Sequence, residues 1–224
     1  KTGQGTQMNR ITLKQLLEIM PSANAAQAAQ FLSHINAAME EFAINTPARQ
    51  AAFLAQIGHE SGSLRYVREI ADGGAYTKRI DLGNTRPEAI ALAKAAGTTT
   101  GRYYKGRGLI QITGYNNYRA CSRDLLHDAD ELCKHPEMLE MLPLSVRSAA
   151  WYWDSRDLNA LADAGKFDLI TKAINGGYNG MADRQAYHAR AQKALASSED
   201  AAGPAPFPNK KPNLFQRIAQ WFRS

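Results

Sequence analysis

The stretch HESGSLRYVRE, residues 59–69, carries two glutamates, Glu60 and Glu69, nine positions apart. On an unbroken α-helix this separation is about two and a half turns, so the carboxyls would point to opposite sides with roughly 13 Å of rise between them. The small residues SGS at 61–63 are typical of a helix end where the chain turns back. The sequence therefore predicts that Glu60 ends a helix and that Glu69 lies on the segment returning past it.

Two carboxyl groups facing each other across a cleft can serve as general acid and general base. Glycoside hydrolysis needs one of them protonated and the other ionised. Two glutamates taken at random would be solvated surface residues, so this chemistry depends on support from the rest of the chain.

The length and composition favour one globular domain. The chain has 224 residues, 44% of them hydrophobic, and no apolar run of 18 or more residues that could span a membrane. The polar N-terminus lacks the pattern of a secretion signal. Residues 1–8 are expected to be an added or unstructured segment, with Met8 as the native start of the protein.

The two cysteines, Cys121 and Cys133, are too few for a disulfide scaffold. Twelve positions apart on one expected helix, they would lie about 18 Å from each other, too far for a disulfide. His127 and His135 alternate with them, but the spacing lacks the close ligand pairs of ordinary zinc sites. We predict reduced thiols, no metal and no cofactor.

Helix caps and hydrophobic spacing indicate a mainly helical chain. A capping box of Thr12 and Gln15 predicts a first helix, Asn24 begins a second, and Thr46 followed by proline begins a third that ends at Glu60. Further helices are expected from about Thr85, Tyr118, Ser145, Asp168 and Met181. The segment GRYYKGRGLIQIT, residues 101–113, differs, because its glycines and alternating apolar residues predict a short strand or extended turn.

The net charge of +6 is concentrated at the C-terminus, where four basic residues and no acidic one follow Asp200. No nucleic-acid-binding motif is present, so a nucleic acid partner is not expected. Residues 201–212 form a Pro-rich linker, and residues 213–224 are predicted to be a basic amphipathic helix of roughly 16 Å, too short to cross a membrane. It could lie on an anionic membrane or lipopolysaccharide, or dock on the domain. The residues expected to bind the membrane are Lys210, Lys211, Arg217, Trp221, Phe222 and Arg223.

Several separated blocks together resemble glycoside hydrolase family 19, the chitinase family that includes many phage lysozymes. They are AAFLAQIGHESGS, Glu69, YYKGRGLIQITGYNNY, AAWYWDSRDLN and AINGGYNGMADR, in the family's order over about residues 45–190. The resemblance implies a mainly α, lysozyme-like two-lobed α+β domain over residues 9–200 with a small extended element. The nine-residue glutamate spacing resembles bacterial and phage members rather than plant chitinases, which implies peptidoglycan as substrate.

The resemblance implies an inverting mechanism with Glu60 as general acid and Glu69 as the base that activates water, their carboxyls roughly 6.5 to 9.5 Å apart. The apolar helix face before Glu60 would favour its protonated form. Thr113 matches a hydroxyl that holds the attacking water with Glu69. Arg184 is expected near Glu69, where its charge would keep the base ionised.

Other residues match sugar-binding positions. The amides of Gln111, Asn117 and Asn175 suit sugar hydroxyls and N-acetyl groups because they both donate and accept hydrogen bonds. The candidate stacking rings are Tyr103, Tyr104, Tyr115 and Trp151, each of which could instead belong to the core, where Trp153 is expected.

The sequence thus predicts a monomeric endolysin of phage or prophage type that cleaves β-1,4 bonds in peptidoglycan strands. It would wait in the host cytoplasm until release and act on the wall in the periplasm. The alternatives are a chitinase, a secreted antibacterial effector with the same domain, a non-catalytic glycan-binding module, and a membrane-active protein dominated by its basic tail. Chitin and peptidoglycan are both β-1,4-linked N-acetylated sugars, so the sequence leaves that choice open.

Overall fold

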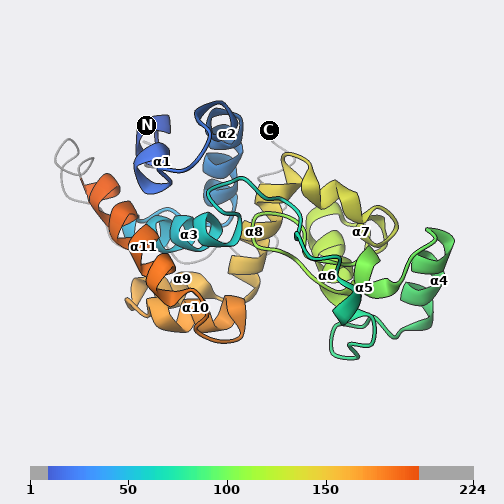
Figure 1. The fold of residues 1–224 in the computed structure, drawn as a ribbon. Coiled ribbons are helices and arrows are strands. Elements are labelled where there is room, and N and C mark those ends of the chain that lie inside the picture. Colours follow the sequence, from blue (N-terminus) through green and yellow to red (C-terminus); the bar gives the residue numbers. More distant parts are fainter. Residues whose placement is uncertain (1–9, 197–224) are drawn as a thin grey trace, which may run out of the picture.

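The computed structural model describes residues 10–196, which are mainly helical and form two lobes joined by α8 (Figure 1). The first lobe contains α1 (Leu13–Ile19), α2 (Ala25–Glu41), α3 (Pro47–Glu60), α9 (Leu158–Asp163), α10 (Phe167–Asn175) and α11 (Met181–Ala196). The second lobe contains α4 (Pro87–Ala95), α5 (Thr100–Tyr103), α6 (Tyr115–Leu126) and α7 (Glu131–Lys134), and α8 (Leu144–Ser155) lies between the lobes. Short 3-10 helices cover Gly74–Tyr76 and Pro136–Glu140. The predicted fold class is confirmed.

Three predicted helix starts are confirmed by their capping hydrogen bonds. The Thr12 hydroxyl accepts from Gln15 N at 3.2 Å, and the Gln15 side chain accepts from Thr12 N at 2.9 Å. The side chains of Asn24 and Thr46 accept from the backbone N–H groups three residues later. These bonds satisfy backbone donors that lack a partner inside the helix, which is why the residue types predict the boundary.

Two of the predicted helix starts were wrong. Thr85 does not cap α4, because Arg86 occupies the N-cap position without a side-chain cap and Pro87 begins the helix. Helix α6 begins at Tyr115 rather than Tyr118, directly after Gly114, whose φ of 88° only glycine adopts easily.

The predicted strand in residues 101–113 is also wrong, and the extended turn is the better description. Gly101 belongs to α5, and the chain after it forms isolated antiparallel bridges that pair Arg107 with Arg68 and with Ile112. Arg107 N donates to Ile112 O and Ile112 N donates to Arg107 O, which closes a tight loop instead of extending a ladder.

Cys121 and Cys133 are free and buried, but they lie on different helices, α6 and α7. The expectation of one helix fails because His127 adopts a left-handed conformation, φ 57°, that ends α6. Burial raises the pKa of both thiols, so they stay protonated near neutral pH.

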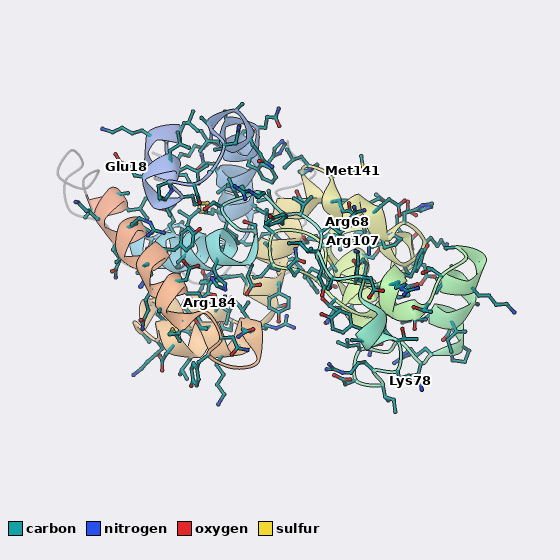
Figure 2. The ribbon with its side chains drawn as sticks, viewed as in Figure 1. Glu18, Arg68, Lys78, Arg107, Met141 and Arg184 are labelled. Atoms are coloured by element: carbon teal, nitrogen blue, oxygen red, sulfur yellow. The ribbon has the colours of Figure 1, made fainter. Side chains whose placement is uncertain are left out.

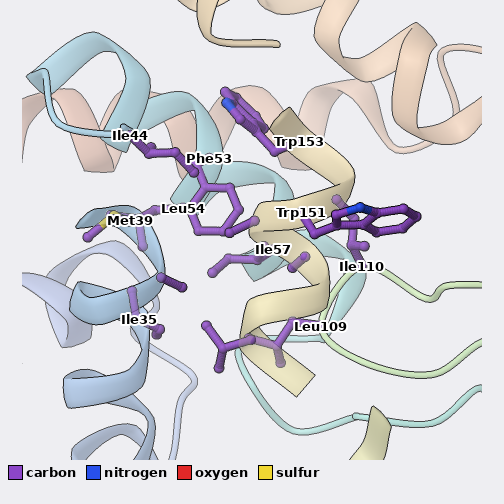
Figure 3. Packing of buried hydrophobic residues seen from close by; sticks show 14 of the residues in the cluster. Ile35, Met39, Ile44, Phe53, Leu54, Ile57, Leu109, Ile110, Trp151 and Trp153 are labelled. Atoms are coloured by element: carbon purple, nitrogen blue, oxygen red, sulfur yellow. The ribbon is translucent and has the colours of Figure 1, made fainter. Parts of the chain in front are cut away.

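The core of the first lobe is built around α3, which is buried continuously from Gln50 to Gly58. The rings of Phe53 on α3 and Trp153 on α8 meet edge to face, with centroids 5.5 Å apart (Figure 3). Trp153 is fully buried, as predicted. This packing fixes the C-terminal end of α3, where Glu60 lies.

Several predictions concern parts of the chain outside the described residues. They are the N-terminal segment 1–8, the linker 201–212 and the tail helix 213–224 with its proposed membrane-binding residues. Within residues 10–196, no helix is both long and apolar enough to cross a membrane.

Candidate active site

Helix α3 ends at Glu60 and the chain reverses directly after it. The Ser61 hydroxyl donates to Ile57 O at 2.6 Å and accepts from Leu64 N at 2.8 Å. Gly62, Ser63 and Leu64 all have positive φ values between 57° and 68°. Three consecutive left-handed residues are rare outside glycine and turn the backbone sharply. The predicted break after Glu60 is therefore confirmed.

Glu69 lies on the returning segment, beside the loop of the second lobe. Its backbone N–H donates to Gly106 O at 2.9 Å, next to the Arg68–Arg107 bridge. Both carboxylate oxygens accept hydrogen bonds, Oε1 from the Tyr76 hydroxyl at 2.8 Å and Oε2 from Gly106 N at 3.1 Å. These two donors hold the Glu69 carboxylate in one orientation beside Gly106.

Tyr76 was not among the residues expected at this site. Burial, followed by the hydrogen bond to Glu69, raises the pKa of Tyr76, so its hydroxyl remains a donor. It lies in the polar stretch GGAYTKR, which has no periodicity or motif that would single out a tyrosine. Only the folded loop brings it to Glu69.

Glu60 contacts Arg184, and this corrects the prediction that Arg184 lies beside Glu69. Arg184 Nη2 donates to Glu60 Oε1 at 2.5 Å, and Nη1 donates to Gln56 Oε1 at 2.5 Å. Arg184 is only 2% exposed and belongs to the first turn of α11, which packs against α3. The N-terminal end of α11 thus meets the C-terminal end of α3. The surroundings of Glu60 are therefore polar and charged, not the apolar environment expected for it.

A second contact joins the same helix ends. His59 Nδ1 lies 2.6 Å from Asp183 Oδ2, one residue before the Glu60–Arg184 pair on each helix. The His59 ring packs directly on Gly180, where an added Cβ would lie 2.3 Å from it. Glycine at 180 is therefore required for the close approach of the α11 start to α3.

The two glutamates are held by different lobes. Arg184, the partner of Glu60, lies in the first lobe, whereas Arg68 and Arg107, which flank the segment of Glu69, lie toward the second lobe (Figure 2). A pair of carboxyls supplied by two lobes is the arrangement that a two-carboxylate hydrolase needs.

Three predicted site residues cluster beside Glu69. A Cβ added at Gly106 would lie 2.7 Å from Gln111 Oε1 and 3.3 Å from Glu69 Oε2, so these side chains meet over that glycine. The Thr113 hydroxyl donates to Gln111 O at 2.9 Å, and the Asn117 amide donates to Thr113 O at 2.7 Å. The Thr113 oxygen keeps lone pairs with which it can accept a hydrogen bond from water.

Asn175 belongs to the opposite side, with Glu60. Its amide donates to Asn179 O at 3.4 Å, and Arg184 Nε donates to the same carbonyl at 3.2 Å. The predicted sugar-binding amides are thus divided between the two lobes.

The aromatic predictions need correction. Tyr104 is fully buried and packs edge to face against Tyr103, Tyr115 and Tyr118, so it has no face for a sugar. Tyr115, 4% exposed, and Trp151 are core residues as well. Tyr103 is half-buried and donates to Lys134 O.

Two exposed rings near the glutamates are better stacking candidates. Tyr66, 39% exposed, follows the turn after Glu60, and Tyr178, 52% exposed, precedes α11. The sequence could not single them out, because exposure depends on which neighbours cover a ring.

No cluster of three or more metal-ligating side chains occurs within residues 10–196.

We expect Tyr76→Phe to lower kcat by about tenfold, because it removes one hydrogen bond to Glu69 and leaves both carboxyls in place. Steady-state kinetics on a soluble oligosaccharide would measure this loss. The matched control is Tyr103→Phe, which removes a hydroxyl bonded to Lys134 O instead. Equal activity of the Tyr76 and Tyr103 variants would contradict a role of Tyr76 in holding Glu69.

Known proteins resemble this chain in both sequence and structure. Residues 22–166 match the family model of glycoside hydrolase family 19, chitinase class I. A Haemophilus influenzae protein described as glycosyl hydrolase family 19 domain-containing is 32% identical over 170 residues, 67% of this chain and 82% of that protein. Endochitinase At2g43610 of Arabidopsis thaliana is 36% identical over 146 residues, 63% of this chain but only 45% of the plant protein. The crystal structure of chitinase C from Streptomyces griseus superposes with a TM-score of 0.64 at 25% identity, covering 88% of this chain and 79% of the other.

Proposed function

The chain belongs to glycoside hydrolase family 19, whose members hydrolyse glycosidic bonds, and we propose that its own substrate is peptidoglycan. The observation that carries the mechanism is that each lobe holds one of the two glutamates, and the family resemblance assigns Glu60 as the general acid and Glu69 as the general base. Glu69 accepts hydrogen bonds from Tyr76 and Gly106 on its two oxygens, and Glu60 accepts one from Arg184 on Oε1. Within residues 10–196, Glu60 Oε2 accepts no hydrogen bond, and it is the oxygen that would carry the proton of the general acid.

In the proposed reaction, Glu69 takes a proton from a water that Thr113 helps to orient. That water attacks the anomeric carbon while Glu60 gives its proton to the departing oxygen, so the configuration inverts. The amides of Gln111, Asn117 and Asn175 would bind the sugars on either side, and Tyr66 and Tyr178 would stack on them.

Two observations support peptidoglycan over chitin. The segment between the glutamates is short, with eight residues between Glu60 and Glu69. The chain also spans most of its bacterial relative but less than half of the plant endochitinase. A compact enzyme of this kind suits an endolysin of phage or prophage type, held in the cytoplasm until release, and we propose this role. The second candidate is a chitinase, which the similarity to the plant endochitinase and to chitinase C favours.

We expect purified peptidoglycan digested by the enzyme to yield fragments that end in a reducing N-acetylmuramic acid. Mass spectrometry after borohydride reduction would identify the reduced sugar, and chitin oligosaccharides would be digested in parallel. A reducing N-acetylglucosamine end would assign the other glycosidic bond. Hydrolysis of chitin oligosaccharides with intact peptidoglycan remaining would overturn the proposed substrate in favour of chitin.

A further inference from the structure

Arg156, at the C-terminal end of α8, is half-buried and stacks on a tyrosine ring. Its guanidinium carbon lies 3.3 Å from the centre of the Tyr152 ring, and Nη1 donates to the Ser155 hydroxyl at 3.0 Å. Within residues 10–196, no carboxylate forms an ion pair with Arg156. Four other buried or half-buried arginines pair with a carboxylate, namely Arg49, Arg107, Arg147 and Arg184, whereas Arg190 also stacks on a tyrosine and donates to a carbonyl instead.

Tyr152 connects Arg156 to the candidate active site. The Tyr152 hydroxyl donates to Ala173 O of α10 at 3.4 Å. Ala173 lies two residues before Asn175 on α10, and the Asn175 amide and Arg184, the partner of Glu60, both donate to Asn179 O. Tyr152 and α10 therefore connect Arg156, at the end of α8, to the side of the candidate site that holds Glu60.

A half-buried guanidinium without an anion is costly. Burial lowers the pKa of Arg156, which reflects the loss of hydration that no carboxylate compensates. The stacked ring holds the guanidinium plane in one orientation, and its planar fork matches the two oxygens of a carboxylate. The arrangement suits an anion supplied from outside the chain.

We propose that Arg156 binds a carboxylate of the substrate and selects muramyl glycans over chitin. Every sugar of chitin is a neutral N-acetylglucosamine. Every second sugar of peptidoglycan carries a lactyl group, whose carboxyl is either free or extended by a peptide with carboxylates of its own. This inference rests on the proposed function, and it assigns to Arg156 the discrimination between peptidoglycan and chitin.

The test compares three substrates with the full-length enzyme. Soluble peptidoglycan strands with peptides carry peptide carboxylates, amidase-treated strands carry free lactyl carboxylates, and chitin oligosaccharides carry neither. For each substrate, kcat/KM is measured with the wild type, Arg156→Gln and Arg156→Lys. The control is Arg190→Gln, because Arg190 also stacks on a tyrosine, Tyr187, and donates to a carbonyl, Ile19 O.

The selectivity of each enzyme is its kcat/KM on a muramyl substrate divided by its kcat/KM on chitin oligosaccharides. We expect Arg156→Gln to lower this ratio by at least about tenfold, mainly because KM for the muramyl substrate increases. Arg156→Lys should lose less selectivity, because lysine keeps the positive charge although it lacks the paired N–H donors of the planar guanidinium. A loss on amidase-treated strands would identify the lactyl carboxylate as the bound group, and a loss on strands with peptides would identify a peptide carboxylate. The wild-type KM for that substrate should rise with salt, and the variant's should rise less.

An unchanged ratio in Arg156→Gln, with the wild type cleaving peptidoglycan, would overturn the role of Arg156 and leave the proposed function standing. The same ratio change in Arg190→Gln would overturn it too, since a stacked arginine in general would then be responsible. A wild type that cleaves chitin oligosaccharides and neither muramyl substrate would overturn the proposed function and this inference together.

Discussion

Replacing Glu60 or Glu69 by glutamine is expected to lower kcat by at least about a hundredfold, the scale of general acid or general base catalysis. Glutamine keeps the shape of each side chain but can neither give nor take the proton. The matched control is Glu18→Gln, because Glu18 lies in the first lobe and, in the described part of the chain, forms only an exposed ion pair with Lys14 (Figure 2). Circular dichroism would establish that each variant is folded.

The two variants should also differ from each other when the leaving group changes. A nitrophenyl glycoside departs with little help from an acid, so the Glu60 variant should recover much of its rate on such a substrate. The Glu69 variant should not, because its water still lacks a base. Near-normal turnover in a folded Glu60→Gln enzyme would end the proposal, and recovery in the Glu69 variant instead would reverse the two roles.

Arg184→Met is expected to lower the free energy of unfolding by about 3 kcal/mol, the lower end of the range for breaking a buried ion pair. The lower end applies because the Glu60 side chain keeps 19% exposure, although Arg184 itself is 2% exposed. Gln56, which is fully buried, would lose a partner at the same time. Urea denaturation would measure the change. Arg190→Met is the control on the same helix and should cost less, because no carboxylate pairs with that arginine in the part of the chain that the structure describes.

A double-mutant cycle tests the cause of this loss. Much of the cost comes from leaving the Glu60 charge without a partner, so adding Glu60→Gln to Arg184→Met should recover part of the stability. Strictly additive losses would show that the two side chains do not act as a pair. A stable Arg184→Met protein with full activity would show that the contact matters for neither folding nor catalysis.

Local physical rules let the sequence determine where helices begin and end. Thr12, Asn24 and Thr46 each place a side-chain oxygen where the first turn of a helix has unpaired N–H groups, so the residue type alone predicts the start. The small residues after Glu60 likewise predict the reversal that separates it from Glu69. For this reason the end of α3 at Glu60 and the mainly helical fold could be predicted without a structure.

Only the tertiary structure decided which side chains meet. Arg184 pairs with Glu60 rather than Glu69 because α11 packs with its first turn against the end of α3, a contact across 124 positions. Tyr76 reaches Glu69 through an irregular loop, and Tyr104 is enclosed by three other tyrosines, so no local pattern distinguishes a donor or a core ring from an exposed one. Gln56 is the exception that the sequence could have revealed, since it lies four residues before Glu60 on the same helix face. Helix caps depend on neighbours in the chain, whereas burial and ion pairing depend on how distant segments pack, and that information is not local.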